Sequence, residues 1–278
     1  LNQSTNGLHF RLRARAFIFD DGKNRVVFVS TDSCMIYTSI KRVVVQKLQQ
    51  KFGPTLYTQA NVMLSGTHTH SGPGGYAEYL IFDITTLGFH KENFNTITEG
   101  IFQAIVMAHT NMKPNVNLLA AAGILLDSNI KCVHPLAVTE LTLYPCSRSP
   151  SSYLANPPSE RAQYQWDVDK QMTVIGKGFR NQTYILILIY LCFLTDCVAQ
   201  GRGNWCDQLV CCARHFNVGP LFIRSNTPNL IARIPRNNTN GLISGDNKGY
   251  ASLFFEQLKN GNTSLPGLGP FIAAFGQR

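Results

Sequence analysis

Two histidines one residue apart, His68 and His70, are the residues of this chain best suited to metal or substrate chemistry. They follow the apolar run of residues 61–66 and precede residues 72–75, a loop of three glycines and a proline. Nitrogen ligands on a rigid element beside flexible backbone suit a metal or substrate site. Residues i and i+2 share one face of a strand, whereas a helix with about 3.6 residues per turn would separate them by about 200°. The spacing therefore predicts that both imidazoles point into one cleft from the end of a strand.

The pair alone leaves two interpretations open. Paired histidines often serve as hydrogen-bonded core or surface residues, so a structural role is as compatible with the motif as metal binding. The glycine loop at residues 72–75 does not favour a phosphate-binding or dinucleotide site, because it lacks both the spacing and the lysine of such loops.

Composition indicates a globular protein with a basic surface. A chain of 278 residues with 44% hydrophobic content can bury a sizeable core in one large domain or two smaller ones. The net charge of +9 comes from 25 basic and 16 acidic residues that are scattered along the chain. Nucleic-acid binding usually needs a clustered patch or a recognisable module, so no nucleic-acid partner is expected. A diffuse positive surface fits an anionic membrane face, and a merely basic soluble protein is the alternative.

The cysteines and the Asn-x-Ser/Thr sequons give information about the cellular compartment of the protein. Cys34 stands alone early in the chain, the other cysteines cluster later, and none forms the paired C-x-x-C framework of a structural zinc site. Four Asn-x-Ser/Thr sequons permit a glycoprotein that is secreted or lies on the extracellular face of the plasma membrane. The polar start lacks both a signal peptide and an initiating Met, so we expect the chain to begin inside a longer precursor. The later cysteines are Cys132, Cys146, Cys192, Cys197, Cys206, Cys211 and Cys212, and the sequons begin at Asn2, Asn181, Asn237 and Asn262.

A β-hairpin is predicted near the start of the chain. Residues 9–20 alternate between polar and apolar types, which is typical of a half-buried strand, and place Arg11, Arg13 and Arg15 together on the polar face. Asp21-Gly22 is a turn signal, and residues 25–32 form a β-branched and aromatic run typical of a buried strand.

A strand, helix, strand unit follows and places the histidines. Residues 39–52 have apolar side chains at helical spacing and are followed by Gly53 and Pro54, and residues 61–66 return as a strand. Residues 25–66 therefore predict a parallel strand pair joined by a right-handed crossover. Asp32 and the two histidines should meet where the parallel strands end, which is where open α/β sheets keep their sites. A capping or turn role for Asp32 is equally compatible with the sequence.

Two further elements are expected downstream. Residues 91–112 carry apolar side chains on one face of a second long helix, with His109 on its polar, solvated side. Residues 117–126 have the composition of another strand.

Several motifs in the same order resemble those of the neutral/alkaline ceramidases. The likeness covers residues 1 to about 130, about 147 to 175 and about 237 to 278. The motifs are HTHSGPGG at 68–75, AHTNMKP at 108–114, RSPSSYL at 148–154 with NP at 156–157, SER at 159–161, DK at 169–170, DNKGYAS at 246–252 and GPFIAAF at 269–275.

The resemblance implies an α/β fold, with a mixed sheet and flanking helices, that represents an incomplete neutral ceramidase catalytic domain. It also implies a zinc-dependent amidohydrolase that cleaves the N-acyl bond of ceramide to a sphingoid base and a fatty acid. Zn²⁺ suits amide cleavage because it lowers the pKa of bound water to about 7 and polarises the carbonyl. In that family His68 would be a zinc ligand, His70 the substrate-side histidine that hydrogen-bonds the amide, and Arg148 an arginine lining the site. The implied partners are ceramide, related N-acylsphingoid lipids and a membrane surface.

The departures from the family pattern matter as well. Residues 131–147 and 176–236 look like insertions or replacements, and no His-Pro motif supplies the family's second zinc ligand. His215 lies in the second segment without matching that motif, and the apolar run at 184–194 is shorter than the roughly 20 residues that span a bilayer. The family's active-site serine and its glutamate and tyrosine ligands would follow Arg278. We therefore expect an incomplete catalytic domain that is inactive by itself, with a non-catalytic remnant or a lipid-surface binding protein as the alternative.

Overall fold

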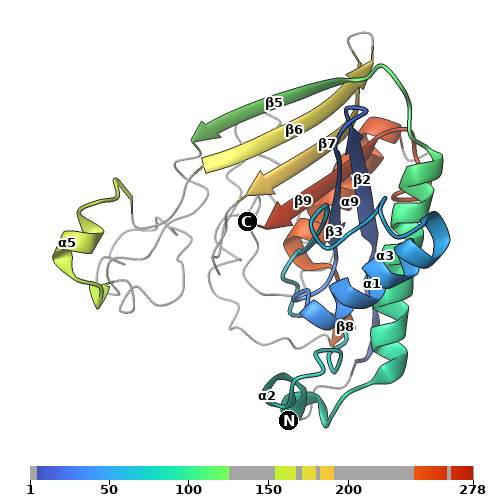
Figure 1. Ribbon diagram of the computed structural model, residues 1–278. Coiled ribbons are helices and arrows are strands. Elements are labelled where there is room, and N and C mark those ends of the chain that lie inside the picture. The colour runs from blue at the N-terminus through green and yellow to red at the C-terminus, as the bar shows by residue number, and fades with distance from the viewer. Residues whose placement is uncertain are drawn as a thin grey trace.

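The computed structural model describes residues 5–124, 154–166, 171–179, 182–190, 241–261 and 264–277 of the chain. These residues form a mixed α/β structure in which helices pack against small sheets (Figure 1). The described strands form one sheet of two strands, one of three and one of four. The predicted fold class is confirmed, with several small sheets in place of a single one.

The three-stranded sheet contains the predicted hairpin and parallel pair. Strand β2 (Ala14–Asp20) runs antiparallel to β3 (Arg25–Thr31), and β3 pairs in parallel with β4 (Val62–Gly66). The connection from β3 to β4 contains α1 (Thr38–Phe52), which ends at Gly53 with a φ of 92° that disfavours any residue with a Cβ.

The main hydrophobic core lies between this sheet and two helices. Helix α1 packs against α3 (Lys91–Thr110), and α3 also packs on β2 and β3 (Figure 1). The predicted helical spacing is confirmed, because the residues it assigned to the apolar face of α1 are buried or, for Val43 and Phe52, partly buried against the core. They include Ile40, Val44 and Leu48, which meet Val27, Val29, Val62, Ile101 and Ile105 in the core.

The predicted solvated position of His109 is wrong. Its Nδ1 atom lies 2.6 Å from the hydroxyl of the fully buried Tyr57, and its ring centroid lies 4.4 Å from that of Phe52. Burial lowers the pKa of His109, so the neutral imidazole is favoured. His109 therefore joins the C-terminal part of α3 to the core.

A second sheet has four strands. Strands β5 (Asn117–Ile124), β6 (Gln171–Phe179) and β7 (Gln182–Tyr190) form an antiparallel series, and β7 pairs in parallel with β9 (Ile272–Gln277). The strand predicted at residues 117–126 is confirmed as β5, and most of the apolar run at 184–194 lies in β7. None of the described helices is both long and apolar enough to cross a membrane.

The remaining described elements are short, except for one helix. Strands β1 (Gly7–Leu8) and β8 (Leu242–Ile243) pair in parallel just before α9 (Asp246–Asn260), which packs on β9. Helix α2 (Leu80–Asp83), the 3₁₀ helix η1 (Ile84–Thr86) and helix α5 (Pro158–Arg161) complete the described elements.

Both faces of β2 are buried, which corrects the predicted polar face. Ala14, Ala16 and Ile18 contact the core beneath α1 and α3, whereas Phe17 faces a second cluster with Phe28 and Ala274 of β9. Arg15 shares the face of Phe17 because side chains alternate along a strand. Arg15 is therefore buried instead of solvated.

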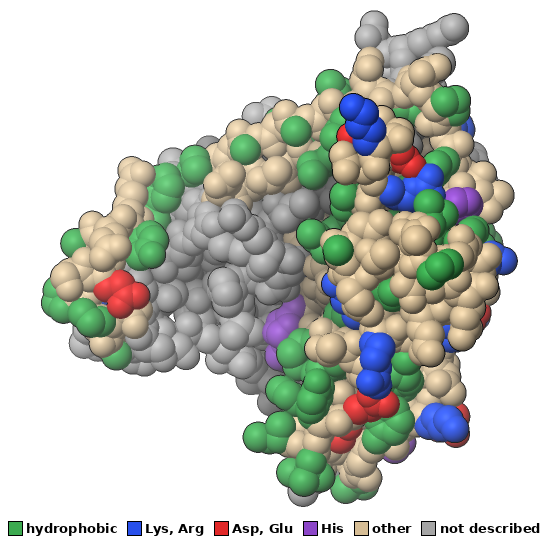
Figure 2. Space-filling view, viewed as in Figure 1, with side chains coloured by type: hydrophobic (Ala, Val, Ile, Leu, Met, Phe, Trp, Pro, Cys, Tyr) green, Lys and Arg blue, Asp and Glu red, His purple; other side chains and the backbone are tan. Residues whose placement is uncertain are grey.

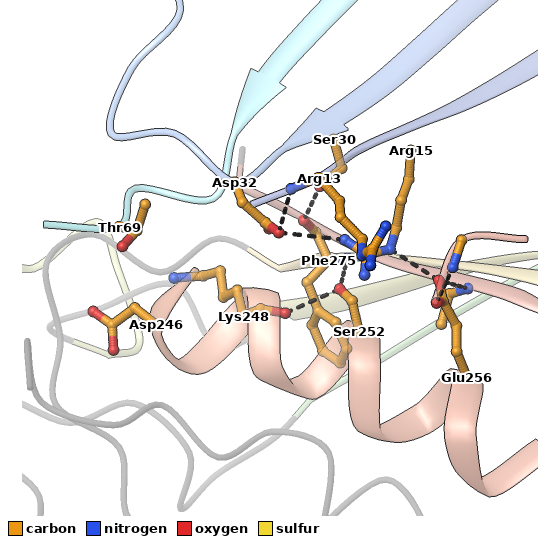
Figure 3. A network of polar contacts seen from close by, with 12 residues as sticks. Arg13, Arg15, Ser30, Asp32, Thr69, Asp246, Lys248, Ser252, Glu256 and Phe275 are labelled. Atoms are coloured by element: carbon orange, nitrogen blue, oxygen red, sulfur yellow. Dashed lines mark hydrogen bonds and ion pairs between the residues drawn. The ribbon is translucent and has the colours of Figure 1, made fainter. Parts of the chain in front are cut away.

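A buried ionic network satisfies the Arg15 guanidinium (Figure 3). Its Nε donates to Glu256 Oε1 of α9 at 2.9 Å, and its Nη1 lies 3.6 Å from Asp32 Oδ2. The Glu256 carboxylate also accepts the backbone N–H groups of Gly267 at 2.7 Å and Ala273 at 3.2 Å. The network joins the N-terminal hairpin to α9 and the segment that leads into β9.

Replacing Glu256 with alanine should lower the free energy of unfolding by about 3–5 kcal/mol, because the Arg15 charge would stay buried without its main partner. Equilibrium unfolding in urea measures this loss. Glu99→Ala is the matched control, because Glu99 is 48% exposed where it pairs with Lys47, and surface pairs contribute about 1 kcal/mol or less. Equal losses in the two variants would contradict the assigned role of the network.

Candidate metal centre

The histidine loop lies across the carboxyl ends of the two parallel strands, as predicted. Thr31 of β3 is the register partner of Gly66 of β4. Immediately beyond β4, the Thr67 amide donates to the Thr31 carbonyl at 2.9 Å and the His68 amide donates to the Ser33 carbonyl at 3.0 Å. These bonds continue the pairing of the strands into the loop and fix where the first imidazole begins.

The two imidazoles converge, but a shared strand face is not the cause. His68 lies outside β4 and has a φ of 65°, in the left-handed region that few non-glycine residues adopt. The two Nε2 atoms nevertheless lie 3.1 Å apart, and the ring centroids are 4.8 Å apart with planes at 65°. A strained turn in the backbone brings the rings together, and such strain concentrates at functional sites.

Hydrogen bonding fixes the tautomer of His68. Its Nδ1 lies 3.0 Å from the backbone carbonyl oxygen of Cys34. A carbonyl oxygen only accepts, so Nδ1 carries the proton and Nε2 offers its lone pair toward His70. Metal-binding histidines are oriented in this way, by donating their second ring N–H to a carbonyl or carboxylate.

Cys34 is a third potential ligand that the sequence reasoning missed. One ligand atom from each of Cys34, His68 and His70 can be chosen so that all three lie within 4.8 Å of one another. Burial raises the pKa of the Cys34 thiol, which favours its neutral form while no cation is bound. One clue to Cys34 was present in the sequence: it closely follows the end of β3, just as His68 closely follows the end of β4.

The donor set fits zinc. Imidazole nitrogen and thiolate sulfur are ligands that zinc prefers. His70 is exposed, so one side of the centre is open to solvent. His68 could hold zinc through Nε2, with the exposed His70 beside it on the side from which substrate would approach.

The segment before α9 anchors the histidine loop. Thr69, which is buried between the two histidines, donates from Oγ1 to the Ser244 carbonyl at 2.7 Å. The Ser244 amide donates to the Ser71 carbonyl at 2.9 Å, and the Ser71 amide donates to Thr69 Oγ1 at 3.1 Å. Both flanks of His70 are thus tied to residues far along the chain.

Asp32 lies at the predicted edge of the sheet, but its contacts serve to hold the fold together. Its Oδ2 accepts the Arg13 amide at 3.0 Å, and a Cβ placed on Gly249 of α9 would be 2.9 Å from Oδ1 (Figure 3). Burial raises the pKa of Asp32, and among the described residues Oδ1 has no hydrogen-bond partner. Asp32 is not part of the described Cys–His cluster.

The other proposed site residue lies outside the described part of the chain. Arg148 falls there, as do His215, residues 131–147, and Asn2, Asn181, Asn237 and Asn262 of the four sequons. Their roles stay predictions.

Comparison with known proteins assigns the family. The family description "Neutral/alkaline non-lysosomal ceramidase, N-terminal" matches residues 1–185 and 234–278. The chain belongs to this ceramidase family. The first matched range includes residues 131–147, and the unmatched gap lies within residues 176–236. The interpretation of these two segments as insertions or replacements stays a prediction.

Curated and solved ceramidases resemble the chain along almost its whole length. Neutral ceramidase A of Dictyostelium discoideum is 46% identical over 277 residues, and the neutral ceramidase of Drosophila melanogaster is 34% identical over 276. Each comparison covers 99% of this chain and 31% of the relative. The crystal structure of neutral ceramidase from Pseudomonas aeruginosa superposes with a TM-score of 0.68 at 29% identity, covering 99% of this chain and 34% of that one. The chain thus spans about a third of the length of these ceramidases.

The glycine loop of the ceramidase motif connects the histidines to the next segment. Gly75 has a φ of 74°, and a Cβ there would collide with the His90 ring and lie 2.9 Å from the Gly88 carbonyl oxygen. Its own carbonyl accepts the His90 amide at 2.6 Å. Only glycine fits this close approach without movement of its neighbours.

Gly75→Ala should lower the free energy of unfolding by about 1–3 kcal/mol, because the new methyl group overpacks the contact with His90. Urea unfolding measures the loss. Gly22→Ala is the matched control, because Gly22 also has a positive φ, 85°, but a Cβ added there would have nothing within 4 Å. The steric account fails if both variants lose the same stability.

Proposed function

We propose that this chain supplies the metal-binding and substrate-side histidines of a zinc-dependent amidohydrolase that cleaves the N-acyl bond of ceramide. Membership of the ceramidase family supports the reaction class and the substrate. The observation that carries the proposal is the 3.1 Å approach of the two Nε2 atoms, with the His68 lone pair directed there by the Cys34 carbonyl.

The two histidines have different roles in this proposal. His68 holds the metal through Nε2, because its Nδ1 is occupied by the Cys34 carbonyl. His70 is exposed beside it and can hydrogen-bond the amide or the tetrahedral intermediate as charge develops on oxygen. Bound zinc would supply a Lewis acid that polarises the amide carbonyl. Arg148 lines the same site in the proposal, on the strength of the motif it belongs to.

Exposed apolar side chains beside the histidine loop support a lipid substrate presented at a membrane surface. We define the apolar lip as Tyr79, Leu80, Ile81, Phe82, Ile84, Leu87 and Phe89, all of which are large and exposed. Figure 2 shows apolar side chains gathered over the α2 end of the molecule. The lip begins at Tyr79, four residues after Gly75, and His90, which follows its last residue, donates its amide to the Gly75 carbonyl. Contiguous exposed apolar patches mark sites for membranes, ligands or other proteins.

The apolar lip also favours the second candidate function, a protein that binds lipid surfaces without catalysis. Under either function, the basic charge and the four sequons support a secreted protein or one on the extracellular face of the plasma membrane.

A chimaera tests the catalytic proposal. This chain would replace the corresponding region of Dictyostelium discoideum neutral ceramidase A, with which it aligns over 277 residues. We expect the chimaera to hydrolyse ceramide and to contain zinc. His68→Ala should lose both, whereas His70→Ala should keep zinc and lower kcat by roughly 10²–10⁴-fold, the usual size of a proton-transfer or oxyanion contribution.

The readouts are fatty acid release from ceramide and zinc content by elemental analysis. His109→Gln is the histidine control, since His109 lies in the Tyr57 contact of the core and its loss should leave both readouts near the unmutated values. A folded chimaera that binds ceramide vesicles without turnover would support the lipid-binding function instead.

Acidic substitutions test the apolar lip. Leu80 and Leu87 are 82% and 84% exposed, so Leu80→Asp and Leu87→Asp should fold normally while weakening sedimentation with ceramide-containing phosphatidylcholine vesicles by about 10-fold or more. Leu265→Asp is the matched control, because Leu265 is 68% exposed on the segment between α9 and β9. If vesicle binding weakened equally in all three variants, the apolar lip would not be the surface that contacts the membrane.

A further inference from the structure

We propose that Thr69 is a positioning residue whose hydroxyl holds His70 in place on the substrate side of the centre. The inference rests on the proposed function and adds a residue that acts through His70. Thr69 lies between the two histidines, and its side chain is buried while that of His70 is exposed. Figure 3 shows Thr69 near the first turn of α9. Core packing does not immobilise an exposed ring, so the backbone on either side of His70 must fix where the ring starts.

Two hydrogen bonds to Ser244 hold the backbone around His70. The Thr69 hydroxyl donates to the Ser244 carbonyl at 2.7 Å, and the Ser244 amide donates to the Ser71 carbonyl at 2.9 Å. One bond lies before His70 and the other lies after it. The Thr69 hydroxyl also accepts the Ser71 amide at 3.1 Å, which closes the short segment on itself. Without this hydroxyl only one of the two bonds to Ser244 would remain, and the segment could rotate about it.

Ser244 is a fixed point for these bonds. Its hydroxyl accepts the Asp246 amide at 3.1 Å and lies 3.1 Å from Nδ1 of His9. The preceding residue, Ile243, belongs to β8, and its carbonyl accepts the His9 amide at 2.8 Å. The pairing of β1 with β8 and the start of α9 therefore hold Ser244 in place. The bonds to Ser244 extend this rigidity to the backbone of His70, as a preorganised site requires.

His68 has its own anchors. Its amide donates to the Ser33 carbonyl at 3.0 Å, and its Nδ1 lies 3.0 Å from the Cys34 carbonyl oxygen. Both of these partners follow β3, whereas Ser244 precedes α9. Loss of the Thr69 hydroxyl should therefore displace His70 while leaving the proposed metal ligand in place.

Thr69→Val in the chimaera with Dictyostelium discoideum neutral ceramidase A tests this role. Valine has nearly the shape of threonine but lacks the hydroxyl. We expect kcat for ceramide to fall by about 10–100-fold, because misplacing a catalytic group by about an ångström has an effect of this size. KM and zinc content should stay near the unmutated values. Thr69→Ser keeps the hydroxyl and should recover most of the lost rate. Thr69→Ala is a second variant without the hydroxyl, in case the added methyl group of valine disturbs folding.

A double-mutant cycle shows whether Thr69 acts through His70. In a His70→Ala background the hydroxyl has no ring to position, so adding Thr69→Val should lower kcat by less than about 2-fold. Amide hydrogen exchange gives a readout that is independent of turnover. Thr69→Val should speed exchange in peptides that contain Ser71, because the Ser71 amide loses its acceptor.

Thr98→Val is the matched control. Thr98 is fully buried in α3, and its hydroxyl donates to the Asn95 carbonyl at 3.0 Å. This variant also loses a threonine hydroxyl bond, but away from the histidine loop. It should keep kcat while its resistance to urea falls about as much as that of Thr69→Val.

The outcomes separate this inference from the proposed function. An unchanged kcat in a folded Thr69→Val chimaera would overturn the positioning role and leave the proposed function standing. Additive losses in the cycle, or an equal fall of kcat in Thr98→Val, would indicate a general effect on folding and would also overturn it. Loss of zinc along with kcat would contradict a role confined to His70. No ceramide hydrolysis by the unmutated chimaera would overturn the proposed function and this inference together.

Discussion

The parallel pairing of β3 with β4 is the constraint on which the centre depends. Residues 27–31 and 62–66 are in register, and the hydrogen bond from the His68 amide to the Ser33 carbonyl extends this register past the strand ends. Two segments that leave adjacent strands at the same edge are thereby held at a fixed separation. The Cys34 carbonyl and the His68 ring meet because of that separation, so the chemistry of the site follows from backbone pairing.

The opposite face of the sheet carries a different kind of stabilisation. Arg15, Asp32 and Glu256 are removed from water together, and desolvation of charges is costly unless each is paired and hydrogen-bonded. Glu256 meets this condition with the Arg15 Nε and two backbone amides. The network thereby ties α9 to the N-terminal hairpin through fully buried groups.

The sequence predicted the elements more fully than their environments. Periodicity located α1, α3 and the first three strands of the main core, because each has an apolar face repeated at its own spacing. It did not reveal that the second face of β2 is also covered, although Phe17 on the same face as Arg15 was compatible with burial. His109 was misassigned for a related reason, since its partner Tyr57 comes from another element and one helix face cannot show that contact.

The sequence predicted where the histidine site lies, but not how its residues are brought together. The motif located His68 and His70, but the alternation of strand side chains was the wrong reason for their convergence, because the positive φ of His68 depends on the surrounding loop. Cys34 was missed since it is 34 residues from His68 in the chain, and a lone cysteine carries no spacing signal. The contact of the Cys34 carbonyl with the His68 ring becomes visible only after the strand register is known.

The contacts between Thr69 and Ser244, and between Arg15 and Glu256, join residues separated by 175 and 241 positions. Closing such long loops is entropically expensive and slows folding, because the cost is met before the contacts form. During synthesis the hairpin and histidine loop leave the ribosome well before α9, so the centre takes its final shape late. A nascent chain that has not reached residue 244 would therefore leave the Arg15 and Phe17 face of β2 open to solvent.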